Sequence, residues 1–216
     1  MDMKQTLISG LPELKLDLTQ AQIDTLCAFG QAVIDQNQVM NLTAITEPQQ
    51  VAKLHLLDSL TVLSALDLKG KSLIDVGCGA GFPGVPLAIA SPQTQVTLLD
   101  SLGKRVNWLK EILPQLGVSA QCVTARAEEA VADRRESYDY AVSRAVARLN
   151  ILLELLAPYV KVGGAVVAMK GSAAKEELAE CAGAMKKLGL KQEAFLEFPV
   201  DGASHAVIIL RKVGPT

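Results

Sequence analysis

Four glycines that follow a short apolar run form the segment of this chain most clearly suited to chemistry. Residues 73–84 read Leu-Ile-Asp-Val-Gly-Cys-Gly-Ala-Gly-Phe-Pro-Gly. The apolar run predicts a buried strand, the glycines predict a turn, and residues 85–90 predict a helix. Glycine accepts positive φ and lets a ligand lie against main-chain N–H groups. A strand, a glycine turn and a helix in this order predict a site for a nucleotide-like ligand.

The spacing of the glycines distinguishes between two classes of ligand. The dinucleotide fingerprint G-x-G-x-x-G, started at Gly77, needs a glycine at position 82, where this chain has Phe82. The pattern present is Asp75-x-Gly77-x-Gly79-x-Gly81, which resembles the first motif of Rossmann-like methyltransferases that use S-adenosylmethionine. It disfavours a nicotinamide oxidoreductase. The alternative is an ordinary strand-to-helix turn, but such turns do not need three alternating glycines.

The ends of the neighbouring strands are the next places to inspect, because open α/β sheets bind ligands outside the carboxyl ends of their strands. Asp100 ends the second strand, 19 residues after Gly81. Its carboxylate is suited to accept hydrogen bonds from the ribose hydroxyls of an adenosine. A helix N-cap is the alternative role, but Ser101 would serve it equally well.

After the third strand, the main chain of Ala127 is placed to bind the adenine edge. Glu128 is either a ligand contact or an acidic residue in a helix's first turn.

The fourth strand ends in Ser143-Arg144-Ala145, where methyltransferases keep their substrate-side motif. An amino-methylating enzyme would carry Asn/Asp-Pro-Pro-Tyr, and a carbon-5 pyrimidine enzyme would carry a nucleophilic cysteine beside a proline; neither pattern occurs. Arg144 supplies a permanently charged donor fork, with a surface ion pair as the alternative. Guanine N7 has a lone pair and no proton, so its methylation needs positioning rather than a base. The missing motifs favour that acceptor.

Alternating strands and helices predict an α/β, Rossmann-like fold with a mostly parallel sheet covered on both faces. The seven expected strands span 72–76, 95–100, 120–124, 138–143, 164–169, 191–198 and 206–211. The helices expected between them span 85–90, 103–115, 126–132, 149–160 and 173–188. The connection at 199–204 is too short for a crossover, so the last two strands should form an antiparallel hairpin.

The chain is expected to form a single domain, 1–216. Residues 1–70 should be an N-terminal helical extension, with helices at 19–37 and about 47–66, on a core of residues 71–213 that binds the cofactor.

Composition excludes several other classes of protein. The net charge of −2 and the pI of about 5.7 do not indicate an overall basic nucleic-acid binder, so any RNA contact should be a local patch. Lys104, Arg105 and Arg148 are candidates, with a solvated face as the alternative. No apolar run reaches the ~20 residues that span a bilayer, and no signal-peptide core is present, so a cytoplasmic protein is expected. Four scattered cysteines and two histidines argue against a disulfide framework or a metal site.

Two features of the extension have ordinary explanations when taken alone. His55, Asp58 and Ser59 share one face of the second expected helix, where a lone histidine is usually a packing residue. Asn41 lies in a turn, where asparagine often bonds its own backbone.

Together these residues resemble the bacterial ribosomal RNA small-subunit methyltransferase G family, also called the glucose-inhibited division protein B family. The matching segments are 41–43, 55–59, 75–84, 98–101 with Lys104 and Arg105, 126–128, 143–145 and 170–171. Many methyltransferases share the glycine motif. The Phe82-Pro83-Gly84 extension and the Ser-Arg-Ala and His-x-x-Asp-Ser segments are far more specific. Cys78 departs from the usual Ser or Thr, and 35–38 lack the Trp and Lys that often precede Asn41.

The resemblance implies N7 methylation of one guanine in a 16S rRNA loop near the decoding site, with S-adenosylmethionine as donor and S-adenosylhomocysteine as product. It implies that Gly77, Phe82, Ala127, Glu128 and Arg144 bind the cofactor. It also makes Asn41, His55 and Lys170 candidates on the substrate side, with Lys170 among those for RNA. The expected partner is 16S rRNA or the small ribosomal subunit, and a monomer without metal or membrane is expected.

Two alternatives from other classes make different predictions. A small-molecule methyltransferase would need a closed, apolar substrate pocket instead of a basic, open face. A non-catalytic RNA- or nucleotide-binding module would bind RNA without forming a methylated product.

Overall fold

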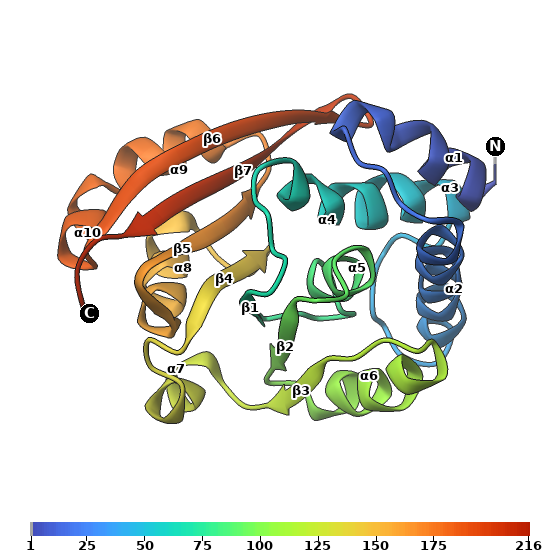
Figure 1. The fold of residues 1–216 in the computed structure, drawn as a ribbon, viewed down its shortest axis with the longest axis horizontal. Coiled ribbons are helices and arrows are strands. Elements are labelled where there is room, and N and C mark those ends of the chain that lie inside the picture. The colour runs from blue at the N-terminus through green and yellow to red at the C-terminus, as the bar shows by residue number, and fades with distance from the viewer. Residues whose placement is uncertain (1) are drawn as a thin grey trace.

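A computed structural model describes residues 2–216 as a seven-stranded sheet with helices on both faces (Figure 1). The strands are β1 Ser72–Val76, β2 Gln95–Asp100, β3 Gln121–Thr124, β4 Tyr138–Arg144, β5 Val160–Lys170, β6 Leu190–Val200 and β7 Ala203–Lys212. Their order is β3-β2-β1-β4-β5-β7-β6, and β7 runs antiparallel to both of its neighbours. The expected mostly parallel sheet with a C-terminal hairpin is confirmed. Because the chain leaves β1 toward β2 on one side and later returns to β4 on the other, the switch point of the sheet lies at β1.

The helices differ from expectation mainly where the chain tightens into short turns. They are α1 Met3–Gly10, α2 Gln20–Asn37, α3 Pro48–Val51, α4 Asp58–Leu60, α5 Gly84–Ala90, α6 Gly103–Gln115, α7 Ala127–Ala130, α8 Leu149–Leu156, α9 Ala174–Glu180 and α10 Ala182–Lys187. The single helix expected over 173–188 is wrong: it breaks at Cys181, whose N–H bonds the nearer carbonyl of Leu178 and whose side chain is buried. The helix expected over 149–160 ends in a 3₁₀ turn that contains Pro158.

The helix expected over 47–66 is present as a continuous helical stretch, but it is not uniformly α-helical. Between α3 and α4 the chain makes a π-helical turn, Ala52–Leu57, and after α4 it tightens into a 3₁₀ turn, Thr61–Ser64. Two hydroxyl groups give the physical reason for this irregularity. Ser59 donates to the carbonyl of His55, and Thr61 donates to the carbonyl of Asp58, so both compete with regular helical hydrogen bonds. π turns are rare and are frequent at functional sites, and this one contains His55.

Successive residues of β1 enter two core layers on opposite faces of the sheet. Leu73 packs with the apolar residues of α2, α5 and α6, whereas Ile74 and Val76 pack with those of α8 and α9. The N-terminal helices belong to the first layer, since Leu7 and Phe29 are fully buried in the same cluster as Leu73.

The β6–β7 hairpin reaches from one end of the molecule toward α1 at the other (Figure 1). Asp201 at its turn forms an ion pair, at 3.0 Å, with Lys53 in the π turn. The hairpin is therefore attached to the N-terminal helices.

Candidate functional site

The loop between β1 and α5 forms a cradle made of main chain. Gly77 and Cys78 donate N–H groups to the carbonyl of Leu99 on β2, at 2.8 and 3.0 Å. Gly77 has a φ of +74°, which side chains rarely adopt. A Cβ atom on it would also lie 2.6 Å from the Cγ2 atom of Val146. This turn therefore needs glycine, as the sequence pattern predicted, and its main chain faces a cavity.

Asp75 lies directly behind this cradle and is fully buried. Its Oδ2 atom accepts a hydrogen bond from the Gly84 N–H at 2.7 Å, while its Oδ1 atom has no protein partner among the described residues. Burial raises the pKa of Asp75 to about 7, although the Gly84 hydrogen bond and the charge of Arg144 both oppose the rise. A buried carboxylate oxygen without a donor fits a site that a ligand's N–H or ammonium group completes.

Asp100 ends β2 and organises the same loop. Its Oδ2 atom accepts from the Gly79 N–H at 2.8 Å, and its Oδ1 atom accepts from the Leu102 N–H at 2.9 Å. The alternative role of Asp100 as a helix N-cap is not seen, and Ser101 does not fill it either, because Leu102 occupies the cap position of α6 without a side-chain hydrogen bond. A carboxylate has about four acceptor sites, so capacity remains for ligand hydroxyls.

Two adjoining cavities open at this end of the sheet. The smaller, of about 250 Å³, is lined by Asp100, Ala127 and Glu128, which are the residues expected to hold the adenosine. The larger, of about 490 Å³, is lined by the glycine loop and by His55, Phe82, Arg105, Arg144 and Thr43. Gly77, Asp100, Ser101 and Val146 line both. The structure thus gathers the sequence-predicted residues of β1, β2, the third strand end and β4 around one divided hollow.

Arg144, at the end of β4, extends into a network of side chains instead of pairing at the surface. Its Nη1 atom donates to the carbonyl of Leu54 at 3.0 Å and to Asp58 Oδ2 at 2.9 Å. Its Nη2 atom lies 3.1 Å from His55 Nδ1, and the guanidinium carbon lies 5.4 Å from the centroid of the Phe82 ring. The guanidinium therefore binds the N-terminal helices while it still borders the larger cavity.

His55 stacks on Phe82 with ring centroids 4.7 Å apart and an interplanar angle of 20°. Burial and the neighbouring charge of Arg144 lower the pKa of His55 to about 4, so the ring is neutral near pH 7. The Nδ1 atom lies 3.1 Å both from the Arg144 Nη2 donor and from the Leu54 carbonyl, which only accepts. The Nε2 atom lies 2.8 Å from Thr43 Oγ1. Both ring nitrogens are thus engaged.

The cationic candidates for RNA contact differ in whether their side chains already have an anionic partner. Lys170 forms a 2.8 Å ion pair with Glu177, and Arg148 forms a 2.7 Å ion pair with Glu180, so both charges are already balanced. Arg105 donates to the main-chain carbonyl of Asn41 at 3.3 Å, which brings two predicted residues together. Lys104 opens α6 beside it, and no ion pair of Lys104 is seen within residues 2–216.

His205 is the residue at this site that the sequence patterns did not indicate. It comes from β7, and its Nδ1 atom lies 2.8 Å from Asp58 Oδ1. The two residues are 147 positions apart, so no local spacing or periodicity joins them. Only the register of the hairpin and its attachment to the N-terminal helices place His205 there.

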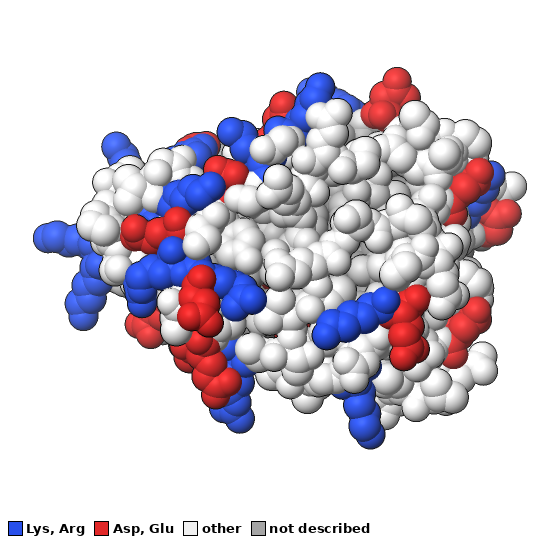
Figure 2. All heavy atoms as spheres, turned by 60° about the horizontal axis from the view of Figure 1, so that its bottom comes forward, with Lys and Arg blue, Asp and Glu red and all other residues white. Residues whose placement is uncertain are grey.

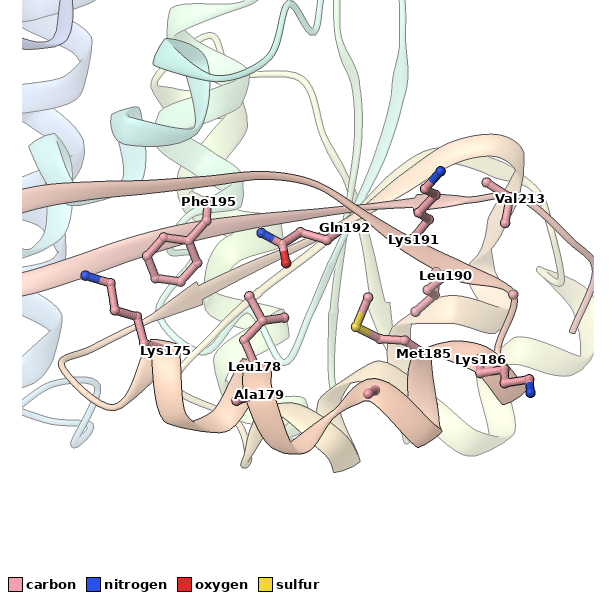
Figure 3. A pocket seen from close by; sticks show the side chains of 12 residues that line it. Lys175, Leu178, Ala179, Met185, Lys186, Leu190, Lys191, Gln192, Phe195 and Val213 are labelled. Atoms are coloured by element: carbon pink, nitrogen blue, oxygen red, sulfur yellow. The ribbon is translucent and has the colours of Figure 1, made fainter.

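Charged surface and larger hollows elsewhere do not add to this site. Figure 2 shows a face on which cationic and anionic side chains intermingle toward one side, while its broad centre carries few charges. A larger hollow of about 950 Å³ lies between α9, α10 and β6. Its apolar floor includes Leu178, Met185 and Phe195, and Lys175, Lys186 and Lys191 line its edges (Figure 3). It contains none of the predicted site residues.

Within residues 2–216, no helix is long and apolar enough to cross a membrane. No group of three or more His, Cys, Asp or Glu residues in that range is arranged to hold a metal ion.

Comparison with known proteins adds a family and a fold to this geometry. The family described as rRNA small subunit methyltransferase G matches residues 22–205. A relative of that name from Alkaliphilus oremlandii is 42% identical over 222 aligned residues, with 100% of this chain and 93% of the relative covered. Among solved structures, M. jannaschii TYW2 in complex with AdoMet superposes with a TM-score of 0.61 at 13% identity, covering 78% of this chain and 79% of that one. A SAM-dependent methyltransferase from Aquifex aeolicus gives 0.57 at 17% identity, covering 82% and 97%.

Proposed function

Because this chain belongs to the rRNA small subunit methyltransferase G family and is a methyltransferase that uses S-adenosylmethionine, we propose that it methylates N7 of one guanine in 16S rRNA near the decoding site. The observation that carries the choice of N7 is the chemistry of the larger cavity. It offers hydrogen-bond donors and an aromatic wall, and the carboxylate among its lining residues, Asp100, already accepts from the Gly79 and Leu102 N–H groups.

Three groups that might have acted as base or nucleophile are each disqualified. Burial raises the pKa of Cys78 well above its ordinary value, with Asp75 and Asp100 adding to the rise, so its thiol stays protonated. Both nitrogens of His55 are engaged, and Asp75 does not line the larger cavity, where the acceptor is assigned. A methyl acceptor that must first lose a proton is poorly served here, whereas guanine N7 needs no such step.

The methyl transfer itself balances without a proton. When bound, S-adenosylmethionine supplies an electrophilic methyl group: the N7 lone pair bonds its carbon, and the C–S bond breaks with its electrons passing to sulfur, which leaves S-adenosylhomocysteine. Positive charge then develops on the guanine. The chain's contribution is to limit competing charge: His55 is neutral, and Asp58 balances Arg144 at 2.9 Å.

We assign donor binding to the cradle and the smaller cavity. The assigned residues are Asp75, Gly77, Gly79, Gly81, Phe82, Asp100, Ala127, Glu128 and Arg144. Two observations support the fit: the unpartnered Oδ1 atom of Asp75, and the turn at Gly77, which leaves no room for a Cβ atom.

The substrate side is assigned to the opposite wall of the larger cavity. His55 is proposed to position the target base there, because its ring stacks on Phe82 at the cavity edge. Arg105 lines the larger cavity, its guanidinium donates to the Asn41 carbonyl, and Lys104 precedes it in α6. All three are proposed to contact RNA. Lys170 and Arg148 are proposed as more distant RNA contacts that act after exchange of their present ion pairs. We further propose action as a cytoplasmic monomer.

Transfer of label from S-adenosyl-[methyl-³H]methionine tests the proposal. Naked 16S rRNA and small ribosomal subunits, both unmethylated, are offered in parallel, with a mixture of small-molecule nucleophiles as the control acceptor. We expect label in guanosine of one or both RNA substrates and none in the control. Label on another base would refute the choice of N7. Label on the small molecules alone, or RNA binding without label, would favour one of the two alternative classes.

A further inference from the structure

Asp58 is the centre of a buried bridge between three parts of the fold. Its side chain is only 5% exposed, and each of its oxygens has a charged or polar partner. Arg144 from β4 binds Oδ2 at 2.9 Å, and His205 from β7 binds Oδ1 at 2.8 Å. Asp58 itself begins α4, just after the π turn. The bridge therefore connects the hairpin with the cavity wall.

The hydrogen bonds of Arg144 explain why this bridge matters for the cavity. The two N–H groups on Nη1 are taken by Leu54 and Asp58, and one on Nη2 faces His55. Of the five N–H groups of a guanidinium, two then remain for a ligand, the Nε one and the second on Nη2. Because the guanidinium is planar, its bonds to Leu54, Asp58 and His55 also fix the direction in which these two free N–H groups point.

Asp58, Arg144 and His205 also shift one another's protonation equilibria. Burial alone would raise the pKa of Asp58, but the His205 hydrogen bond and the Arg144 charge bring it below its ordinary value. The Asp58 hydrogen bond raises the pKa of His205, against burial and the charge of Arg144. His55 and Asp75 are the other titratable groups that sense Arg144. Without a donor at His205, one oxygen of a buried carboxylate would lose its partner, which is costly.

We propose that His205 is a positioning residue for methyl transfer: by binding Asp58 it holds the Arg144 guanidinium against His55 and beside the Phe82 ring. His205 lines neither cavity of the site, so it acts through Asp58 and not by touching the reactants. This inference rests on the function proposed above and adds a residue from the C-terminal hairpin to it.

The kinetic test compares two substitutions of His205 with a neighbouring control. Leucine fills the space without a donor, whereas asparagine places an amide N–H near the position of Nδ1. We expect His205→Leu to lower kcat by about 10- to 100-fold while the KM for S-adenosylmethionine changes by less than about 3-fold. His205→Asn should restore most of the rate. Ser204→Ala, whose hydroxyl contacts only Glu197, should behave as the wild type.

A spectroscopic test is available because the chain has only two histidines. In the His205→Leu variant, the single histidine signal in an NMR titration belongs to His55. If His205 holds Arg144 in place, its loss lets the guanidinium move away, and the pKa of His55 rises above about 4. In His205→Asn it should stay near 4. Thermal melting of each variant confirms that the chains compared are folded.

The outcomes separate this inference from the proposed function. A lowered kcat and a raised pKa of His55 in His205→Leu, both reversed in His205→Asn, would support positioning. An unchanged kcat and an unchanged pKa of His55 in a folded His205→Leu chain would overturn it. If the wild type itself transfers no methyl to rRNA, the proposed function fails, whereas the histidine titration still decides whether His205 holds the Arg144 network.

Discussion

The two halves of the site are built in opposite ways. The donor half is built around one continuous segment, residues 75–84, and uses main-chain groups, as in the Gly77 and Cys78 N–H bonds to Leu99. The acceptor half uses side chains of four separated segments, centred on Arg144 and Asp58. A main-chain cradle tolerates a changed side chain such as Cys78 but excludes a Cβ atom at its tightest turns. A side-chain network is instead sensitive to the loss of any one side chain, because each partner supplies at least one of its bonds.

The halves also differ in their electrostatics. The donor half holds two carboxylates, Asp75 and Asp100, bound mainly by N–H groups. The acceptor half pairs a cation with an anion and leaves His55 neutral. A positively charged donor and an acceptor that gains positive charge during the reaction are therefore each faced by groups of suitable sign.

The largest effect should come from Arg144, which borders both the cofactor and the acceptor network. We expect Arg144→Ala to lower kcat by about 10²- to 10³-fold, because it removes preorganised donors and leaves Asp58 and His55 short of partners. Affinity for S-adenosylhomocysteine, measured by calorimetry, should fall by a smaller factor of about 10. Unchanged affinity would remove Arg144 from the donor half, and an unchanged rate would remove it from the acceptor half. Arg144→Lys keeps the charge without the fork and should be intermediate.

The next largest effect should come from a Cβ atom in the cradle. At Gly84 it would lie 2.3 Å from Leu98 Cδ2 and 2.8 Å from Asp75 Oδ2. We expect Gly84→Ala to lower the free energy of unfolding by about 1–3 kcal/mol and to weaken S-adenosylhomocysteine binding. Urea unfolding and calorimetry measure the two effects.

Gly77 offers a matched pair with Gly70, which has a similar φ of +70° but open space around it. Gly77→Ala should share the cost of left-handed backbone, about 1–2 kcal/mol, and should also lose cofactor affinity. Gly70→Ala should show only the stability cost. Equal affinities for S-adenosylhomocysteine in these two variants would contradict a main-chain cradle at Gly77.

A smaller, pH-dependent effect should mark the neutral His55. Its pKa of about 4 lies below the ordinary value of 6.5, so it stabilises the fold above pH 6.5, and that stability is lost as the pH falls toward 4. The stability advantage of the wild type over His55→Asn should therefore shrink by about 2 kcal/mol between pH 7 and pH 5. Urea unfolding at the two pH values measures it. A constant difference would mean that His55 is not held neutral by burial and Arg144.

The smallest effect should come from the mouth of the cavity. Lys104→Ala and Arg105→Ala should each weaken rRNA binding a few-fold and reduce the slope of log affinity against log salt by about 1. Lys186→Ala, in the hollow beside α10, is the matched control and should leave the slope unchanged. Filter binding over a salt series distinguishes them. Equal slopes in all three variants would place the RNA elsewhere.

What the sequence predicted follows the same division between the halves. The seven strands, the closing hairpin and the glycine cradle each depend on residues close together in the chain, where periodicity and turn residues carry the signal. The neutral state of His55, the bridge through Asp58 and the contribution of His205 depend on contacts such as one that spans 147 positions. Short-range patterns contain no record of such contacts. The π turn was missed for a different reason: it depends on local bonds from hydroxyl groups to carbonyls three and four residues earlier, which the apolar periodicity does not record.

The most direct test of the account is chemical mapping of N7-methylguanine in the RNA product. Reduction followed by aniline cleaves an RNA strand at guanines methylated on N7, and primer extension locates the break. We predict one new cleavage in 16S rRNA after incubation with this enzyme and S-adenosylmethionine, and its absence with Arg144→Ala over the same time. Methyl incorporation without any such cleavage would show that another atom accepts the methyl group, and it would contradict a site built for an acceptor that has no proton to lose.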